Sequence, residues 1–214
     1  MLDFKNHLTN GSKKLGIDIS PLQILMMEQY AKELMIWNKK INLTAIKDPL
    51  QVAEKHFIDS IAVMPLLKNG ICMMDMGSGG GFPGIVIKIM NPSIKVVLID
   101  SVSKKVSFLK HIVRLLNLEN IDAVHSRVQD LHNDENYAGQ FDAIISRAFA
   151  DLSKYVGLAR PFINPCGCIF AMKGKQGQSE VTSEILENYK LNTEHYWLPF
   201  DNSKRSVIQM TIRS

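Results

Sequence analysis

The sequence predicts an α/β protein in which a mostly parallel sheet of seven strands is covered by helices on both faces. From residue 71 onward, short apolar runs alternate with stretches of helical periodicity. Strands that are apolar on both sides are typical of buried parallel sheets. A loop with five glycines follows the first apolar run. Two more strand-like runs near the C-terminus fit a closing antiparallel hairpin.

The first 68 residues are expected to form a helical extension. Residues 1–19 are weakly patterned and predict irregular structure or a short helix. Residues 20–41 begin with serine and proline, the N-cap and first position of a helix, and carry one apolar face. Residues 48–64 open on a similar signal and also have helical spacing. These two amphipathic helices are expected to pack on residues 69–214, the α/β core of a single domain. A partner-binding module is the alternative, and their mixed charge argues against a membrane-surface role.

The helices and strands of the core follow one another in a regular order. The clearest helix spans residues 104–118, where apolar side chains recur on one face. The closing hairpin is expected at residues 193–198 and 207–212, which flank the turn-rich residues 199–203. The parallel strands are expected at 71–76, 95–99, 121–125, 141–146 and 168–173.

Bulk composition is consistent with one buried core and no membrane span. The chain has 214 residues, 46% of them hydrophobic, which suffices for a single core. No stretch approaches the ~18 to 20 apolar residues that would cross a bilayer, so we expect the protein in the cytoplasm. We also expect a monomer. The formal charge of +4 permits a nucleic-acid partner without requiring one. Three cysteines and six scattered histidines lack metal-ligand spacing, so no metal is expected.

The glycine-rich loop Gly77–Gly84 carries the first functional signal. Glycines let a backbone turn sharply and leave its N–H groups open to a ligand. Residues 79–84 satisfy the pattern GxGxxG, which by itself leaves a nicotinamide dinucleotide open. Asp75 precedes the loop and completes Asp-x-Gly-x-Gly, which is common in sites for S-adenosylmethionine. Asp100 ends the second strand and can accept hydrogen bonds from ribose hydroxyls, which both cofactors carry. The alternative for Asp100 is a cap on the helix that starts near Ser103.

Three other enzyme classes leave signatures that this sequence lacks. Short-chain dehydrogenases need Tyr-x-x-x-Lys, and no tyrosine here has a lysine four residues later. Phosphate-binding loops continue with Gly-Lys-Ser/Thr, whereas Ile85 and Val86 follow this loop. The hydrolase pattern GxSxG is also absent. These absences favour S-adenosylmethionine as the cofactor.

Several separated blocks, in one order along the chain, resemble a known family. They are Asn42–Ile46, Lys55–Ser60, Gly77–Gly84, Arg127–Gln129, Ser146–Ala148 and Lys173–Gly174. Over residues 35–212 the chain is similar to the RsmG family, also called GidB, glucose-inhibited division protein B. The resemblance implies a class I, Rossmann-like methyltransferase that uses S-adenosylmethionine and methylates guanine N7 in small-subunit (16S) ribosomal RNA. The implied partner is this RNA or a ribosomal particle.

The resemblance also implies residue roles in cofactor binding. Two positions depart from the family, which usually has alanine at Gly80 and glutamate at Gln129. Glycine at the first should only loosen the loop. The neutral amide of Gln129 keeps an acceptor but loses charge assistance, so cofactor binding should be weaker rather than lost. The resemblance implies that Gly77, Phe82, Val128, Gln129 and Arg147 bind the cofactor, and the glycine pattern and the end of the second strand add Gly79 and Asp100.

The implied acceptor sets the expected mechanism and RNA contacts. Guanine N7 carries a lone pair and no proton, so no proton-transfer catalyst is expected; alignment is the task of the enzyme. A-form RNA hides N7 in a deep groove, so the target must be unpaired or swung out. Arg147 could meet the cofactor carboxylate or an RNA phosphate, and the sequence leaves both open. The candidate RNA contacts are Lys39, Lys40, His56, Arg147, Lys173, Lys175 and Arg205.

Two other functions remain as alternatives at this point. A methyltransferase acting on a small molecule or a protein would share the loop and Asp100, without the two N-terminal blocks. A non-catalytic module that binds S-adenosylmethionine or RNA would be expected to carry a damaged loop and basic tails. The loop here is intact and the tails are short.

Overall fold

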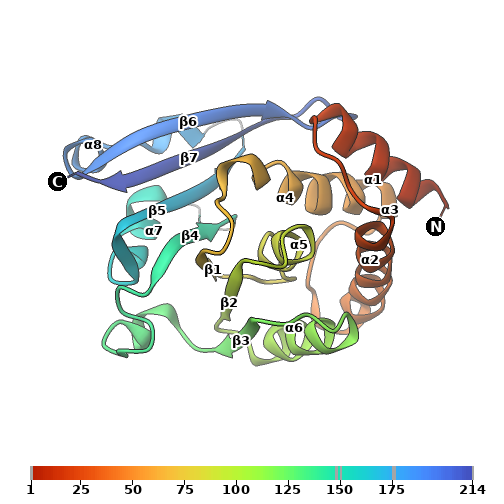
Figure 1. The fold of residues 1–214 in the computed structure, drawn as a ribbon, viewed down its shortest axis with the longest axis horizontal. Helices are drawn as coiled ribbons and strands as arrows, with labels where there is room; N and C mark the ends of the chain where they lie inside the picture. Colours follow the sequence, from red (N-terminus) through yellow and green to blue (C-terminus); the bar gives the residue numbers. More distant parts are fainter. Residues whose placement is uncertain (1, 148, 150, 175–176, 214) are drawn as a thin grey trace.

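One seven-stranded sheet forms the centre of the computed structural model, among the residues that it describes: 2–147, 149, 151–174 and 177–213 (Figure 1). The strand order is β3-β2-β1-β4-β5-β7-β6. The first five strands run parallel, and β7 lies antiparallel between β5 and β6. The expected fold class is therefore confirmed. The strands are β1 (Cys72–Met76), β2 (Lys95–Asp100), β3 (Ile121–His125), β4 (Phe141–Ser146), β5 (Ile163–Lys173), β6 (Tyr189–Trp197) and β7 (Lys204–Ile212).

Helices cover both faces of the sheet and build two hydrophobic cores. In β1, Met73 belongs to the core beneath the N-terminal helices, α5 and α6. Its neighbours Met74 and Met76 point to the other face, where α7 and α8 pack. The apolar character of the strands on both sides follows from this two-sided burial. The helices of the core are α5 (Gly84–Met90), α6 (Ser103–Leu115), α7 (Leu152–Ala159) and α8 (Ser183–Asn188), with 3-10 turns η2 (Met64–Leu66), η3 (Val128–Leu131) and η4 (Gly177–Glu180).

The topology defines where a ligand can bind. The chain moves outward from β1 to β2 and β3, then returns to β4 on the other side of β1. Open α/β sheets bind ligands at the carboxyl ends of the strands, where the strand order reverses in this way. The glycine loop follows β1 at this point, and Arg147 follows β4.

The N-terminal helices pack on the same core as α5 and α6. The first, α1 (Leu2–Lys14), is a full helix rather than irregular structure, and its Phe4 and Leu8 are buried. The second, α2 (Pro21–Ile41), begins with the expected cap: Gln23 donates its backbone N–H to Ser20, and its side chain accepts from the N–H of Ser20. These helices are therefore part of the fold's hydrophobic core.

The next helical segment contains an irregular turn. It runs through α3 (Pro49–Val52), a π-helical turn η1 (Ala53–Ile58) and α4 (Asp59–Ile61). The N–H of Asp59 donates to the carbonyl of Glu54, five residues earlier. Single π-helical turns inside α-helices are frequent at functional sites.

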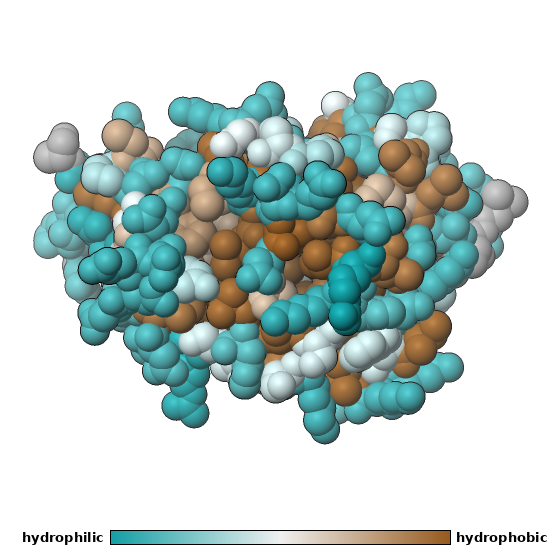
Figure 2. Space-filling model, turned by 60° about the horizontal axis from the view of Figure 1, so that its bottom comes forward, coloured by the Kyte–Doolittle hydropathy of each residue, from teal (hydrophilic) through white to brown (hydrophobic). Residues whose placement is uncertain are grey.

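The surface is mixed in polarity. Figure 2 shows mostly hydrophilic side chains on one face, with hydrophobic side chains gathered across its middle. No helix in the described part of the chain is long and apolar enough to cross a membrane.

Candidate active site

The glycine loop takes backbone conformations that favour glycine. Gly77, Gly79 and Gly81 have φ values of 75°, 56° and 89°, in the left-handed region that side chains rarely adopt. The N–H groups of Gly77 and Ser78 both donate to the carbonyl of Ile99, at 2.9 and 3.0 Å. The loop therefore turns over the carboxyl end of β2.

Asp75 holds the end of the loop through a buried hydrogen bond. Its side chain is fully buried, and its Oδ2 accepts the N–H of Gly84 at 2.7 Å. A Cβ atom on Gly84 would lie only 2.6 Å from that oxygen and 2.4 Å from Leu98 Cδ2. Oδ1 has no hydrogen-bond partner within the described residues. Asp75 thus anchors the start of α5 at Gly84.

The burial of Asp75 predicts a pH-dependent stability. Burial raises the pKa of this carboxyl to about 7, against opposing effects of the Gly84 N–H and the Arg147 charge. In the unfolded chain the pKa is about 3.9. Between these values the folded protein holds a proton that the unfolded chain has lost, so the free energy of unfolding falls as pH rises through this window.

In the wild type, the free energy of unfolding should fall by about 3 kcal/mol between pH 5 and pH 8 because of Asp75. We expect Asp75→Asn to remove this pH dependence. Urea denaturation of both proteins at pH 5, 6, 7 and 8 measures the difference. Asp18→Asn, at an exposed acid, serves as the control. Parallel stability curves for the wild type and Asp75→Asn would contradict the shifted pKa.

Aromatic side chains from the N-terminal helical segments pack against the loop. Tyr30 of α2 donates its hydroxyl to the carbonyl of Gly80 and is fully buried. Its ring stacks on Phe82, with centroids 5.1 Å apart and an interplanar angle of 10°. His56 stacks against the same ring at 4.8 Å. Phe82 is 4% exposed, so its side chain serves packing, and any ligand contact at this residue would be through its backbone.

A cavity of about 370 Å³ lies at the carboxyl ends of β2 and β3. It contains four of the seven residues expected to bind cofactor: Gly77, Asp100, Val128 and Gln129. Gly79, Phe82 and Arg147 are not among its lining residues. Arg127, from the quoted block Arg127–Gln129, lines the cavity without an expected role, and the remaining lining residues are Ile99, Ser101, Ser126, Phe149, Lys154 and Leu158.

Asp100 connects the loop to this cavity. Its Oδ2 accepts the N–H of Gly79 at 2.9 Å, and its Oδ1 accepts the N–H of Val102 at 2.8 Å. Val102 is the N-cap of α6, and no side chain caps the helix there, so Asp100 does not have the alternative role of a helix cap. Carboxylate oxygens can each accept more than one hydrogen bond. Asp100 can therefore order the loop and still receive a hydroxyl from the cavity.

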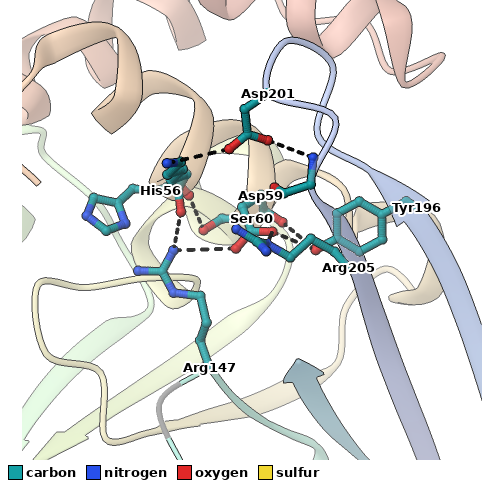
Figure 3. A network of polar contacts seen from close by, with 9 residues as sticks. His56, Asp59, Ser60, Arg147, Tyr196, Asp201 and Arg205 are labelled. Carbon is teal, nitrogen blue, oxygen red and sulfur yellow. Dashed lines mark hydrogen bonds and ion pairs between the residues drawn. The ribbon is translucent and has the colours of Figure 1, made fainter. Parts of the chain in front are cut away.

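A second cavity, of about 380 Å³, is lined by most of the residues expected to contact RNA, of which Figure 3 labels His56, Arg147 and Arg205. His56, Arg147, Lys173 and Arg205 line it together, although they come from different elements. Its other lining residues are Ile46, Lys55, Asp59, Met172, Gly174 and Tyr196. Lys39 and Lys40 are exposed in the last turn of α2 and do not line it, and Lys175 lies outside the described residues.

Arg147 is held by three groups in this second cavity. Its Nη1 donates to the carbonyl of Lys55 at 2.8 Å and lies 3.6 Å from Asp59 Oδ2. Its guanidinium carbon lies 5.2 Å from the centre of the Phe82 ring. A cation over an aromatic face is a favourable contact. Arg147 therefore joins the second cavity to the aromatic stack above the glycine loop.

The remaining polar groups of the second cavity are also constrained. Burial, followed by the charge of Arg147, lowers the pKa of His56 to about 3, so its imidazole is neutral at physiological pH. His56 Nε2 and Thr44 Oγ1 lie 2.7 Å apart. Lys173 donates to the Phe149 carbonyl at 2.8 Å and to Glu180 at 2.5 Å. Lys173 thus fixes Phe149, which lines the first cavity.

Sequence reasoning missed Tyr30, Phe149 and Tyr196. Helical periodicity places Tyr30 on the buried face of α2, but no spacing relates it to Gly80. Tyr196 fell within an expected strand without a signal for its hydroxyl. Asp59 lay inside the quoted block Lys55–Ser60, but no spacing relates it to Arg147 or Arg205.

Comparisons with known proteins agree on one family. The family model "GidB: rRNA small subunit methyltransferase G" matches residues 23–208. The chain is 39% identical to ribosomal RNA small subunit methyltransferase G of Geobacter metallireducens, covering 96% of this chain and 95% of the relative. The protein of the same name from Acinetobacter baumannii (strain SDF) is 42% identical, with 97% and 98% covered.

Solved structures show the same fold at low sequence identity. A SAM-dependent methyltransferase from Aquifex aeolicus superposes with a TM-score of 0.59 at 19% identity, covering 80% of this chain and 97% of that one. A predicted O-methyltransferase from Agrobacterium tumefaciens gives a TM-score of 0.61 at 13% identity, with 74% and 80% covered. These similarities concern the fold alone.

Proposed function

The chain belongs to the rRNA small subunit methyltransferase G (GidB) family, and we propose that its two cavities bind S-adenosylmethionine and a guanosine of 16S rRNA. S-adenosylmethionine is the cofactor, and N7 of the guanine is the methyl acceptor. The observation that carries the proposal is the first cavity. There, the glycine loop, the end of β2 and the turn η3 bring together Gly77, Asp100, Val128 and Gln129.

The residues of the first cavity suit a nucleoside cofactor. Its volume falls within the usual range for small ligands, about 300 to 1,000 Å³. Asp100 offers carboxylate oxygens to ribose hydroxyls, while Val128 and Gln129 can pair with the edge of an adenine. A Cβ on Gly77 would come within 3.6 Å of Phe149 and fill part of the space. Leu158 adds an apolar side chain to the lining.

The chain's own residues then orient the reactants and exclude water. Bound in the first cavity, S-adenosylmethionine supplies a methyl group attached to a positively charged sulfur. Guanine N7 has an available lone pair, so no residue needs to remove a proton. His56, in the second cavity, has a pKa of about 3, which is too low for a general base at neutral pH. Alignment within ~3 to 3.5 Å in a dry site can supply several kcal/mol.

The proposed RNA substrate explains the basic second cavity. Lys55, Arg147 and Arg205 contribute positive charge at one place, where an unpaired or swung-out guanosine could enter. His56 and Lys173 line the same cavity, and Lys39 would extend the contact surface along α2. If these groups meet phosphates, RNA affinity should fall steeply as salt rises.

A methyl-transfer assay tests the function directly. Labelled methyl from S-adenosylmethionine is offered to small-subunit particles and to the protein-free RNA, and modified sites are mapped by cleavage at 7-methylguanine. We expect label in the RNA at N7, and comparison of the substrates tells whether a particle is required. Label in small molecules or proteins, with none in either RNA substrate, would instead favour the alternative methyltransferase.

The amide at position 129 gives a separate prediction. Gln129→Glu should tighten binding of S-adenosylmethionine about three- to ten-fold, because a charged acceptor strengthens a hydrogen bond from the adenine amine. Isothermal titration measures the affinity. Gln140→Glu, at an exposed amide away from both cavities, is the matched control. Weaker binding by Gln129→Glu would contradict the placement of the adenine.

We also propose that the enzyme acts as a monomer in the cytoplasm, where ribosomal RNA is found. One chain supplies the lining of both cavities, so no partner copy is needed to complete them. Light scattering of the purified protein measures its mass in solution. A stable dimer with the cavities at its interface would contradict this proposal.

A further inference from the structure

We propose that Asp59 is a positioning residue that holds Arg147 and Arg205 as a pair, and that this pair binds the phosphate of the target nucleotide. This inference rests on the proposed function, since it requires an RNA substrate. It assigns a role to a side chain that has none in the proposed function. It also chooses between the two possible partners of Arg147.

One carboxylate bridges two arginines from distant parts of the chain (Figure 3). Asp59 is 5% exposed and directly follows the π-helical turn. Its Oδ2 lies 3.6 Å from Nη1 of Arg147, which comes from the end of β4. Its Oδ1 lies 3.5 Å from Nε of Arg205 in β7 and accepts the hydroxyl of Tyr196 at 2.8 Å. Each carboxylate oxygen therefore fixes one guanidinium.

The arrangement is costly unless it serves a purpose beyond stability. Burial raises the pKa of Asp59, while Arg147, Tyr196 and Arg205 act in the opposite direction. Removing a carboxylate from water costs several kcal/mol, and a buried ion pair seldom returns more than this. What the pair does achieve is a fixed geometry for two side chains that otherwise have many rotamers.

The two guanidinium groups remain available to the cavity. Their side chains are 22% and 24% exposed, and both line the second cavity together with Lys55. A guanidinium carries five N–H donors in a planar fork, a geometry that matches phosphate oxygens. The contacts to Asp59 involve Nη1 of Arg147 and Nε of Arg205. A phosphate can thus be received by two forks at once.

The charge balance of the reaction favours a phosphate as the partner. When the N7 lone pair forms the new N–C bond, the bond between the methyl carbon and sulfur breaks, so the sulfur becomes neutral and the positive charge moves onto the guanine ring. The lining of the second cavity carries four cationic side chains against the one carboxylate of Asp59, so that charge would be repelled. A phosphate on the arginine pair compensates it before methyl transfer. Arg147 does not line the first cavity, which argues against the cofactor carboxylate.

Two possible roles of Asp59 predict opposite changes in RNA binding when its charge is removed. If the carboxylate merely reduced the positive potential, Asp59→Asn would make the cavity more positive and bind RNA more tightly. If it positions the arginines, Asp59→Asn lets them repel each other and separate, and RNA binds more weakly. The sign of the change therefore decides between the two roles.

The test measures steady-state methylation of small-subunit particles by the full-length enzyme. For Asp59→Asn we expect KM for the particle to rise about ten-fold, with the Kd for S-adenosylmethionine unchanged within two-fold. Tyr196→Phe keeps the ring and all charges but removes the hydroxyl donor, so we expect a smaller rise, about three-fold. Asp18→Asn makes the same change in net charge at an exposed site and should leave KM unaltered.

An unchanged or lowered KM for Asp59→Asn would overturn the proposal. So would a parallel loss of S-adenosylmethionine affinity and of melting temperature, which would indicate a structural role. Adding Asp59→Asn to Arg205→Ala should raise KM by less than a further two-fold, because the arginine pair is already broken in the single variant. A further ten-fold rise would also refute the proposal. Failure of the wild type to methylate any RNA would refute the proposed function instead.

Discussion

Gly81→Ala is expected to abolish binding of S-adenosylmethionine and to lower the free energy of unfolding by about 3 kcal/mol. Gly81 has a φ of 89°, where a side chain costs about 1 to 2 kcal/mol. Its Cβ would also lie 2.5 Å from the Tyr30 hydroxyl and 2.6 Å from Ile85 Cδ1. Overpacking of this kind costs about 1 to 3 kcal/mol. The displaced loop would no longer present Gly77 to the first cavity.

Isothermal titration with the cofactor and urea denaturation measure the two effects. Gly70→Ala is the matched control, because Gly70 has a φ of 71° with no atom within 4 Å of the added Cβ. It should lose only the conformational cost of about 1 to 2 kcal/mol and bind the cofactor normally. Equal destabilisation of the two variants, with cofactor binding intact in both, would show that contact with Tyr30 does not shape the loop.

Arg147→Lys is expected to lower kcat/KM for the RNA substrate by 100-fold or more, about 2.7 kcal/mol of transition-state stabilisation. Arg147 contacts the Lys55 carbonyl, the Asp59 carboxylate and the face of Phe82 together. A lysine ammonium lacks the planar fork that makes these contacts simultaneous. Positive charge is kept, so the loss would measure geometry rather than net charge.

Methylation kinetics on small-subunit particles measure this effect, and titration with S-adenosylmethionine provides the contrast. Cofactor affinity should change by less than about three-fold, because Arg147 lies outside the first cavity. Arg114→Lys, at an exposed arginine of α6, should leave both quantities unaltered. A loss of cofactor affinity equal to the loss of activity would place Arg147 on the cofactor instead.

The order of strands and helices could be predicted from the sequence, because buried parallel strands and amphipathic helices differ in apolar period. The boundaries were less accurate. β5 begins at Ile163 rather than residue 168, since Pro165 and Gly167 interrupt its apolar run. β6 begins at Tyr189 rather than residue 193, because alternate residues face solvent and leave a weak pattern.

The site could be predicted only in part. Blocks of sequence identified the loop and residues 128–129, and the end of the second strand identified Asp100. Of these, Gly77, Asp100, Val128 and Gln129 line one cavity. The contacts of Tyr30 with Gly80 and of Asp59 with two arginines depend on how helices pack against strands far away in the chain. A single sequence carries no direct signal of such pairings, and therefore the supporting side chains became visible only in the structure.

The hydrogen bond from the Tyr30 hydroxyl to the Gly80 carbonyl has a consequence for engineering this protein. The tyrosine belongs to the first 41 residues, whereas the carbonyl belongs to the loop that follows β1. A shortened enzyme starting at residue 69 would therefore keep every glycine of the loop and still lose the hydrogen bond from Tyr30 that holds it. Transplanting the loop into another methyltransferase scaffold would need a tyrosine supplied from an equivalent helix.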